Sequence, residues 1–558
     1  MINSPSVSRR TVILFYVVIA VAILIWIRRI AVAWRFTLRY DDAYMFYRYA
    51  LQMRAGYGFA WNAAGGPTYG PTSLLWTATV FVLSLLPLPA GKALLLGSWV
   101  FGGVAVGVMA WSVSAAAASP LMRSKVRVAG MIGLPLMLLT PYWLNSVTGM
   151  DTMESLAMNA LAAGMIVLWT QKATVARATM AGLCGLLAFL ARPDSALPIL
   201  LLALLADRLL VKREERGRTL WVLMGILFAG IGLDLLLCRL YFGTAVPLSF
   251  YVKAGGGYAG YAADWHPALS GFRFLRATAV FLLPMIVLID RRHWRLAVTF
   301  LVPVVVAFGY YMTLVLQIMG TPSRFYAPLF PFVVIPAMLM LDEAISSRPT
   351  GLVKRASMRL GTIAVLLLAA GPMRTVQHVD AMLLGHKVVY REPMRATGAG
   401  KPLAPMEWFE AQKALTDELL AKLPARASVA STEVGYMGAM APQVDVIDLA
   451  GLNNTEISRH GFSAQRVFAM RPDIIWMPMR EYSYMCGIVY SAPELLRDYD
   501  VWDGAFTYGL AVRKDSPYRK QIDEVFKPAM AKFYPGVETK DYLIRSVEWN
   551  REPYRWPN

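Results

Sequence analysis

The sequence is poor in charged residues. Of its 558 residues only 16% are Asp, Glu, Lys or Arg, whereas 57% are hydrophobic, and the mean hydropathy is +0.47. This composition argues against an ordinary soluble enzyme, in which about 25% of residues are charged. Several uninterrupted apolar runs are long enough to cross a bilayer, and we therefore expect a polytopic membrane protein.

Cysteine is scarce as well. The three cysteines, Cys184, Cys238 and Cys486, are widely spaced, which argues against a disulfide framework and against a cysteine metal cluster. No cleavage pattern of small residues follows the first apolar run, Thr11–Ile27, so we interpret this run as a retained transmembrane helix. The sequence shows neither an internal repeat nor a low-complexity tract.

Ten further apolar runs predict a total of eleven transmembrane helices. Their approximate ranges are 92–115, 128–144, 155–171, 178–191, 195–211, 219–241, 274–290, 295–318, 325–345 and 358–373. Another run, Ser73–Pro87, has about 15 residues between prolines, which suits an interfacial or re-entrant helix better than a span.

The distribution of positive charge predicts the orientation. If Ser73–Pro87 does not cross, alternate loops rich in Lys and Arg, among them those containing Lys125 and Arg218, fall on the same side as Arg9 and Arg10. The positive-inside rule then places the N-terminus in the cytoplasm and the C-terminal region outside. We therefore attribute most of the formal net charge of +19 to orientation, and we expect no nucleic-acid partner.

Past Pro372 the composition changes to that of a soluble domain. Short apolar stretches alternate there with polar turns, and they predict a small α/β layer structure. The predicted strands lie in Ala427–Gly435, Val444–Leu452, Pro472–Pro478 and Phe506–Asp515, with a helix around Ser463–Met470. We divide the chain into a transmembrane domain, 1–373, a linker, 374–405, and an extracytoplasmic α/β domain, 406–558.

Two adjacent carboxylates, Asp41 and Asp42, follow the first span within "RYDDAYMFYRYA". One interpretation is an interfacial aromatic belt with two solvated acids. The other is a catalytic pair. Apolar neighbours raise the pKa of a carboxylate toward the value that a general base near neutral pH requires, and a second carboxylate separates the two roles. Arg39 and Arg48 are close enough in sequence to orient either acid.

Ordered motifs along most of the chain resemble one family. After the Asp-Asp pair come "RYA", a Gly-x-Gly, "WN" and "YGPTSLLW", and further on "TGMDTMES", "ARPDS", "PLSFYVKAGGG" and "VIDLAGLNNTEISRHG". These segments resemble GT-C fold glycosyltransferases that use polyprenyl-phosphate sugars, in particular the mycobacterial terminal arabinofuranosyltransferase family. The resemblance implies an α-helical polytopic membrane protein with about eleven transmembrane helices, juxtamembrane helices and a C-terminal soluble α/β domain.

The resemblance also implies an activity. It is the inverting transfer of a sugar, with arabinofuranose favoured, from a polyprenyl-phosphate donor to a cell-envelope glycan at the outer face of a bacterial plasma membrane. Asp41, or else Asp42, removes the proton of the acceptor hydroxyl. No cofactor is required, and a divalent cation, Mg²⁺ or Mn²⁺, is an optional addition without assigned ligands. We expect the C-terminal domain to help bind the acceptor.

The remaining site residues are expected to bind the two substrates. Lys253, Arg192 and Arg324 are the cations expected to bind the donor phosphate at the lipid interface. The residues expected to contact the rest of the substrates are Arg39, Tyr44, Arg48, Trp61, Asn62, Tyr69, Asp151 and Tyr251.

Several alternatives stay open. The same fold could glycosylate a surface protein such as pilin or flagellin, or could transfer another sugar. A polytopic transporter should show paired broken helices in two related halves, and none is visible in the sequence. A non-catalytic envelope carbohydrate-binding protein would explain the outer domain, but not the gathering of carboxylates and cations on one face of the membrane part.

Overall fold

The chain packs as two compact units. The computed structural model describes residues 9–254, 267–289, 293–315, 323–347, 396–397, 403, 406–479 and 482–549. Unit 1 comprises Met1–Leu38, Leu95–Ile231 and Trp265–His386, and unit 2 comprises Arg39–Leu94, Gly232–Asp264 and Lys387–Asn558. Unit 2 thus joins the segment after the first helix to the C-terminal region, whereas the division by composition separates them at residues 373 and 406.

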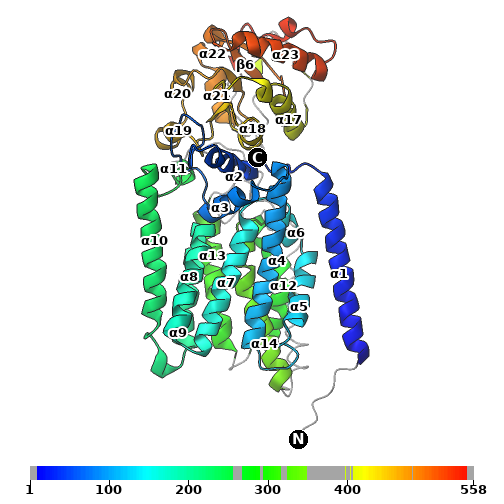
Figure 1. Cartoon of the computed structure of the whole chain (residues 1–558), viewed down its shortest axis with the longest axis vertical. Coiled ribbons are helices and arrows are strands. Elements are labelled where there is room, and N and C mark those ends of the chain that lie inside the picture. The colour runs from blue at the N-terminus through cyan, green and yellow to red at the C-terminus, as the bar shows by residue number, and fades with distance from the viewer. Residues whose placement is uncertain are drawn as a thin grey trace, which may run out of the picture. The chain divides into compact units, whose positions relative to one another are not determined.

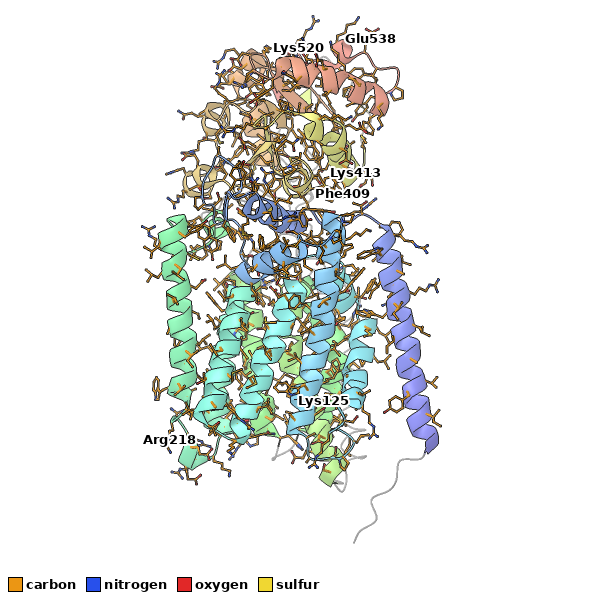
Figure 2. All side chains as sticks on the ribbon, viewed as in Figure 1. Lys125, Arg218, Phe409, Lys413, Lys520 and Glu538 are labelled. Carbon is orange, nitrogen blue, oxygen red and sulfur yellow. The ribbon has the colours of Figure 1, made fainter. Side chains whose placement is uncertain are left out.

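Unit 1 is helical, and its helices α7 and α8 run side by side (Figure 1). Its elements are α1 (Arg9–Arg35), most of α4 (Ala90–Ala116), α5 (Lys125–Leu138), α6 (Thr140–Ser146), α7 (Thr152–Gln171), α8 (Val175–Ala191), η1 (Pro193–Ser195), α9 (Ala196–Leu209), η2 (Arg213–Glu215), the first half of α10 (Leu220–Phe242), α12 (Pro267–Leu288), α13 (Trp294–Thr313), η3 (Ala327–Leu329) and α14 (Phe330–Ser347). Lys125 and Arg218 lie at the same end of these helices (Figure 2).

The helices include candidate membrane spans, which confirms the prediction of a membrane protein. Within the described ranges, six helices are long and apolar enough to cross a bilayer, or seven if the bent pair α5 and α6 is one span. They are Ala90–Ala116, Thr152–Gln171, Leu220–Phe242, Ser270–Leu288, Trp294–Thr313 and Ala327–Ser346. The predicted span 358–373 lies outside the described residues, and the total of eleven stays a prediction.

The predicted span 128–144 is wrong as a continuous helix. The chain bends by 86° between α5 and α6, at Leu139, whose backbone is extended. Pro141 follows at the start of α6, where its missing N–H and its ring exclude it from the interior of a longer helix. The two helical segments therefore run in different directions.

The run Ser73–Pro87 contains α3 (Leu74–Leu83), a helix of 10 residues. The Ser73 hydroxyl caps it by accepting a hydrogen bond from the backbone N–H of Trp76. At 1.5 Å per residue α3 is about 15 Å long, about half the thickness of a bilayer core. It packs against α2 (Asp41–Arg54) within unit 2.

Unit 2 contains a five-stranded sheet, which confirms the predicted small sheet domain. The strand order is β3-β2-β4-β6-β5, with β2 (Ser428–Ser431), β3 (Asp445–Asp448), β4 (Ile474–Trp476), β5 (Tyr499–Trp502) and β6 (Leu510–Arg513). β2 pairs in parallel with β3 and β4, while β6 is antiparallel to β4 and β5. Four of these strands lie within the predicted stretches, and β5 was not predicted.

Helices cover this sheet, and the predicted helix around 463–470 is among them. They are α17 (Trp408–Glu418), η4 (Leu420–Lys422), α18 (Gly435–Met440), α19 (Thr455–His460), α20 (Ala464–Ala469), α21 (Ser483–Tyr490), α22 (Pro493–Asp498), α23 (Arg519–Phe533) and η5 (Thr539–Tyr542). A two-stranded pair, β1 (Ala396–Thr397) and β7 (Glu548–Trp549), completes the unit, with α11 (Leu248–Ala254). Apart from β1 and Leu403, the predicted linker 374–405 lies outside the described residues.

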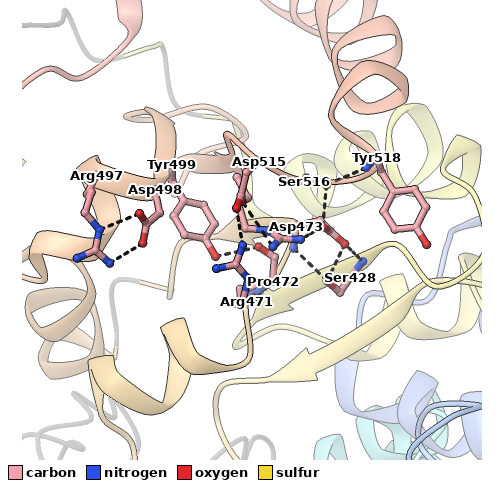
Figure 3. A network of polar contacts seen from close by, with 11 residues as sticks. Ser428, Arg471, Pro472, Asp473, Arg497, Asp498, Tyr499, Asp515, Ser516 and Tyr518 are labelled. Carbon is pink, nitrogen blue, oxygen red and sulfur yellow. Dashed lines mark hydrogen bonds and ion pairs between the residues drawn. The ribbon is translucent and has the colours of Figure 1, made fainter.

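A buried carboxylate ties the β2, β4 and β6 strands together at one end (Figure 3). Asp473 Oδ1 accepts hydrogen bonds from Arg513 Nη2 (2.6 Å) and Ser516 Oγ (2.7 Å), and its Oδ2 accepts two from Ser428, from the backbone N and from Oγ (both 2.8 Å). Burial alone would raise the pKa of Asp473, but the hydrogen bonds from Arg513, Ser516 and Ser428 outweigh it and lower the pKa.

Candidate functional site

The Asp-Asp pair forms the first turn of α2, following Tyr40 in an extended conformation. Negative side chains are favourable at this end of a helix, because they face its unpaired backbone N–H groups. The two carboxylates differ in environment. Asp41 is 1% exposed, whereas Asp42 is half-buried.

The Asp41 carboxylate is held by three donors from the sheet domain of unit 2. Its Oδ1 accepts hydrogen bonds from Tyr436 N (2.7 Å) and Gln412 Nε2 (2.7 Å), and its Oδ2 accepts one from Gly435 N (2.8 Å). Burial raises the pKa of Asp41 to about 6, against the opposing effect of these donors, and the neighbouring Asp42 charge raises it further. Asp41 is thus a hydrogen-bonded, buried carboxylate next to a more accessible one.

The contact is made at the carboxyl end of β2, because α18 follows that strand directly. β2 has parallel neighbours on both sides, and in open α/β sheets this end of the central strands is where ligands bind. A side chain of α2 fills this position here. Gly435 makes the approach possible, because a Cβ atom on it would overlap the carbonyl oxygen of Asp41.

Arg48 makes a second buried contact, about two turns further along the same face of α2. Its guanidinium donates to the carbonyl oxygens of Trp61 (2.7 Å), Gly438 (2.7 Å) and Val444 (2.9 Å) and to Asn62 Oδ1 (2.7 Å). It also lies over the Trp61 ring, 4.9 Å from the ring centroid. Burial lowers the pKa of Arg48 to about 10, which leaves the group charged at neutral pH.

Trp61 and Asn62 bind the edge strand of the sheet. Val446 is in β3, which lies at one edge, and its backbone N donates to Asn62 Oδ1 (2.9 Å). The Val446 carbonyl accepts from Asn62 Nδ2 (3.0 Å) and from Trp61 Nε1 (2.8 Å). The Asn62 amide therefore pairs with β3 as a neighbouring strand would, and it covers part of an otherwise open edge.

The segment "DLAGLNN" forms a buried turn that binds α2. Asp448 accepts from the backbone N–H groups of Ala450 and Asn453 and from Asn453 Nδ2, all at 2.9 Å. Tyr49 donates from its hydroxyl to Asn453 Oδ1 (2.9 Å). Burial raises the pKa of Asp448 to about 7. A Cβ on Gly70 would overlap both the Asn453 and the Tyr49 side-chain oxygens, so this turn also fixes the loop after α2.

The other predicted residues of unit 2 have separate contacts, some of them buried and some exposed. Tyr44 is buried edge-on against the Tyr436 ring, with centroids 5.2 Å apart. Arg39 is exposed and pairs with Glu410 (3.1 Å). Tyr69 stacks on Phe242, with centroids 4.8 Å apart. On α11, the Tyr251 hydroxyl contacts Thr244 Oγ1 (2.9 Å), and Lys253 is exposed.

The two arginines predicted to bind the donor phosphate, Arg192 and Arg324, lie in unit 1, and each is paired with an aspartate. Arg192 takes an extended backbone before Pro193, which ends α8, and binds Asp194 through Nε (3.1 Å) and Nη2 (2.6 Å). Arg324 Nη2 lies 3.3 Å from Asp151 Oδ1. Both guanidinium groups lie over the Phe325 ring, at 5.1 and 5.8 Å from its centroid. The charges of these two pairs balance within the protein.

The structure therefore brings together Asp41, Tyr44, Arg48, Trp61 and Asn62 around α18 and β3. Arg192, Arg324 and Asp151 form a separate cluster in unit 1. In the part of the chain that the structure describes, no group of three or more His, Cys, Asp or Glu side chains is placed to hold a metal ion.

Sequence reasoning missed the partners that the sheet domain supplies to α2, chiefly Gln412, Gly435, Tyr436 and Gly438. The available signal was the pair of glycines three residues apart in "GYMGAM", because small residues at that spacing let two helices approach closely. A Cβ on Gly438 would come within 2.7 Å of Arg48 Cδ. Figure 2 labels Phe409 and Lys413, which belong to α17, the helix that carries Gln412.

One comparison with known proteins gives a match, and it covers part of unit 2. Residues 406–527 match a family described as "Domain of unknown function (DUF8728)". The match runs from just before α17 into α23 and so includes all five strands of the sheet. No curated protein matches the chain. Over these residues the chain is thus similar to a family without an assigned activity.

Proposed function

We propose that the protein is an integral-membrane glycosyltransferase that moves a sugar from a polyprenyl-phosphate donor to a cell-envelope acceptor. The observation that carries the proposal is the unequal Asp pair at the start of α2. A general base must reach its substrate, and Asp42 is half-buried while Asp41 is 1% exposed and hydrogen-bonded three times. We therefore assign the base to Asp42 and a supporting role to Asp41.

The proposed reaction is a displacement with inversion at the anomeric carbon. The acceptor hydroxyl oxygen forms a bond to this carbon while the bond from the carbon to the phosphate oxygen breaks, and the electron pair leaves with the phosphate. The hydroxyl proton passes to the Asp42 carboxylate. The hydrogen bonds of Asp41 to the backbone of α18 fix the start of α2, and with it the position of Asp42.

The cations differ in their readiness to bind the donor phosphate. Arg192 and Arg324 are buried and paired with Asp194 and Asp151, so a phosphate at either one has to enter the protein and compete with a carboxylate. Lys253 is exposed on α11, which belongs to the same unit as Asp42. We therefore propose Lys253 as the first phosphate ligand, with its ammonium group acting as a point charge on the leaving group.

The resemblance in sequence supports the rest of the proposal. It favours arabinofuranose as the sugar, a glycan as the acceptor, and a bacterial plasma membrane with the N-terminus in the cytoplasm and the reaction outside. A surface glycoprotein acceptor or another sugar is compatible with the same chemistry.

The test is transfer from polyprenyl-phosphoryl arabinose by the full chain in nanodiscs. Wild type, Asp42→Asn and Asp41→Asn are compared, with folding followed by thermal melting. We expect Asp42→Asn to keep the wild-type melting temperature and to lose transfer, and Asp41→Asn to lose both transfer and stability. Full transfer by Asp42→Asn would remove the assigned base. If wild type binds glycans but transfers nothing from any polyprenyl-phosphate sugar, the chain is a carbohydrate-binding protein instead.

A further inference from the structure

We propose that Gln412, on α17 of the sheet domain, is a positioning residue for the carboxylate pair, so that this domain sets the charge of the pair as well as contacting the acceptor. The inference rests on the proposed function. It adds a residue outside the resemblance in sequence, since the motifs that carry the resemblance do not include "EAQKAL".

Gln412 bridges the Asp41 side chain and the backbone at Glu433. Its side chain is fully buried, and Nε2 donates both to Asp41 Oδ1 (2.7 Å) and to the carbonyl oxygen of Glu433 (3.2 Å). The two N–H groups of one amide are thus used, one on the carboxylate and one on the chain segment that leads into α18. The backbone of α18 supplies the other two donors of Asp41. Gln412 therefore helps to hold all three donors in position around the carboxylate.

The partner atoms dictate the ionised form of Asp41. Its three donors are all N–H groups, which bind a carboxylate oxygen and offer nothing to accept a carboxylic acid proton. Hydrogen bonds to the charged form favour that form, so loss of one donor makes Asp41 easier to protonate.

The elements packed around the pair carry several titratable groups. They are Asp42 and Tyr44 on α2, Tyr436 on α18, Glu433 before α18, Glu407 just before α17, and Glu410, Lys413 and Asp417 on α17. Glu407 and Glu410 pair with Arg39 at the surface, and Lys413 pairs with Asp417. The nearby charges are mostly negative, so the neutral amide of Gln412 stabilises the Asp41 anion without adding a further charge.

The test compares the pH dependence of kcat/KM for transfer in wild type, Gln412→Leu and Gln412→Glu. Gln443→Leu is the matched control, because Gln443 Nε2 also donates to carbonyl oxygens in this domain, those of Leu420, Ala421 and Leu423, without reaching Asp41. The acid limb reports protonation of the Asp41–Asp42 pair as a whole. We expect it to move to higher pH by about half a unit in Gln412→Leu, and further in Gln412→Glu, where a third carboxyl group joins the pair. Gln443→Leu should keep the wild-type acid limb even if it melts earlier.

A double-mutant cycle on melting temperature measures the same contact without the reaction, using Gln412→Leu, Asp41→Ala and both together. We expect the two effects on melting temperature to be non-additive, because each change breaks the same hydrogen bond between Gln412 and Asp41. A Gln412→Leu variant with the wild-type acid limb, or an additive cycle, would overturn the inference. If wild type itself transfers no sugar, the proposed function fails, and the cycle still decides whether Gln412 holds Asp41.

Discussion

Oδ1 of Asp41 lies 2.7 Å from the backbone nitrogen of Tyr436, which follows it by 395 residues in the chain. The contact means that α2 is a structural part of the sheet domain. Arg48 and Asn62 repeat the relationship, since their partners Gly438 and Val446 also lie in that domain. Unit 2 is therefore assembled from segments at opposite ends of the sequence, and its folding depends on α2.

The first prediction compares the two aspartates. Asp41→Ala removes three hydrogen bonds to a buried charge and leaves two backbone N–H groups of α18 without acceptors, which should cost about 3–5 kcal/mol of unit 2 stability. For a unit of this size that is a fall in Tm of about 10 °C. Asp42→Ala should cost less than about 1 kcal/mol, the value of a helix N-terminal charge. Thermal melting of the full chain in detergent measures both, and equal losses would contradict the difference in burial.

The second prediction concerns the approach of α18 to α2. In Gly435→Ala the new methyl group would overlap the carbonyl oxygen of Asp41, which is backbone and cannot rotate away. We expect a loss of about 3 kcal/mol or more, since overpacking a tight contact forces the backbone apart. Gly65→Ala is the control, because its Cβ would meet only ordinary contacts, the closest at 3.6 Å. A Gly435→Ala variant that melts like wild type would show that the two helices separate easily.

The sheet was largely predictable because its strands are local patterns. β2, β3, β4 and β6 each coincide with a short apolar stretch between polar turns, and Ser463 caps α20 through the Arg466 N–H as its sequence suggests. β5 was missed because "DYDVWD" places three acids among its three hydrophobic residues. The bend between α5 and α6 was missed because the apolar run continues through Pro141, and hydropathy does not register a direction change.

Some residues of the candidate site lie together as the sequence suggested, but their contacts were not predicted. The sequence singled out Asp41, Arg48, Trp61 and Asn62 as unusual polar or aromatic residues at the start of a loop, and all four are buried or half-buried in specific hydrogen bonds. Their partners are mostly backbone atoms of β3 and α18, for which the glycine pair in "GYMGAM" is the one signal that we find in the sequence. Hydrogen bonds between residues several hundred positions apart are set by tertiary packing, which cannot be read from a single sequence.

The third prediction tests Arg48. Arg48→Lys keeps the charge but replaces a planar fork with a single ammonium group, which cannot reach acceptors on Trp61, Asn62, Gly438 and Val444 together. We expect unit 2 to lose about 3 kcal/mol. Arg39→Lys is the matched control, because Arg39 is exposed and its pair with Glu410 lies in solvent, and it should melt like wild type. Equal melting temperatures of Arg48→Lys and Arg39→Lys would contradict the prediction that the buried contacts of Arg48 stabilise unit 2.

The last prediction concerns acid and the Asp473 cluster (Figure 3). Because the folded protein lowers the pKa of Asp473, the ionised carboxylate stabilises the fold at neutral pH, and this stabilisation is lost as the pH falls below the unfolded value of about 4 toward the lower folded value. Asp473→Asn should therefore lower the free energy of unfolding at pH 7 by about 2 kcal/mol, and the Tm with it. Between pH 5 and pH 3 the Tm of this variant should fall less steeply than that of wild type, because the contribution of the Asp473 carboxylate is absent. Asp515→Asn is the control within the same cluster, because the Asp515 side chain is 64% exposed and its pair with Arg471 is solvated. The assignment of Asp473 as the acid-sensitive group of the sheet is wrong if Asp473→Asn keeps the wild-type slope of Tm against pH.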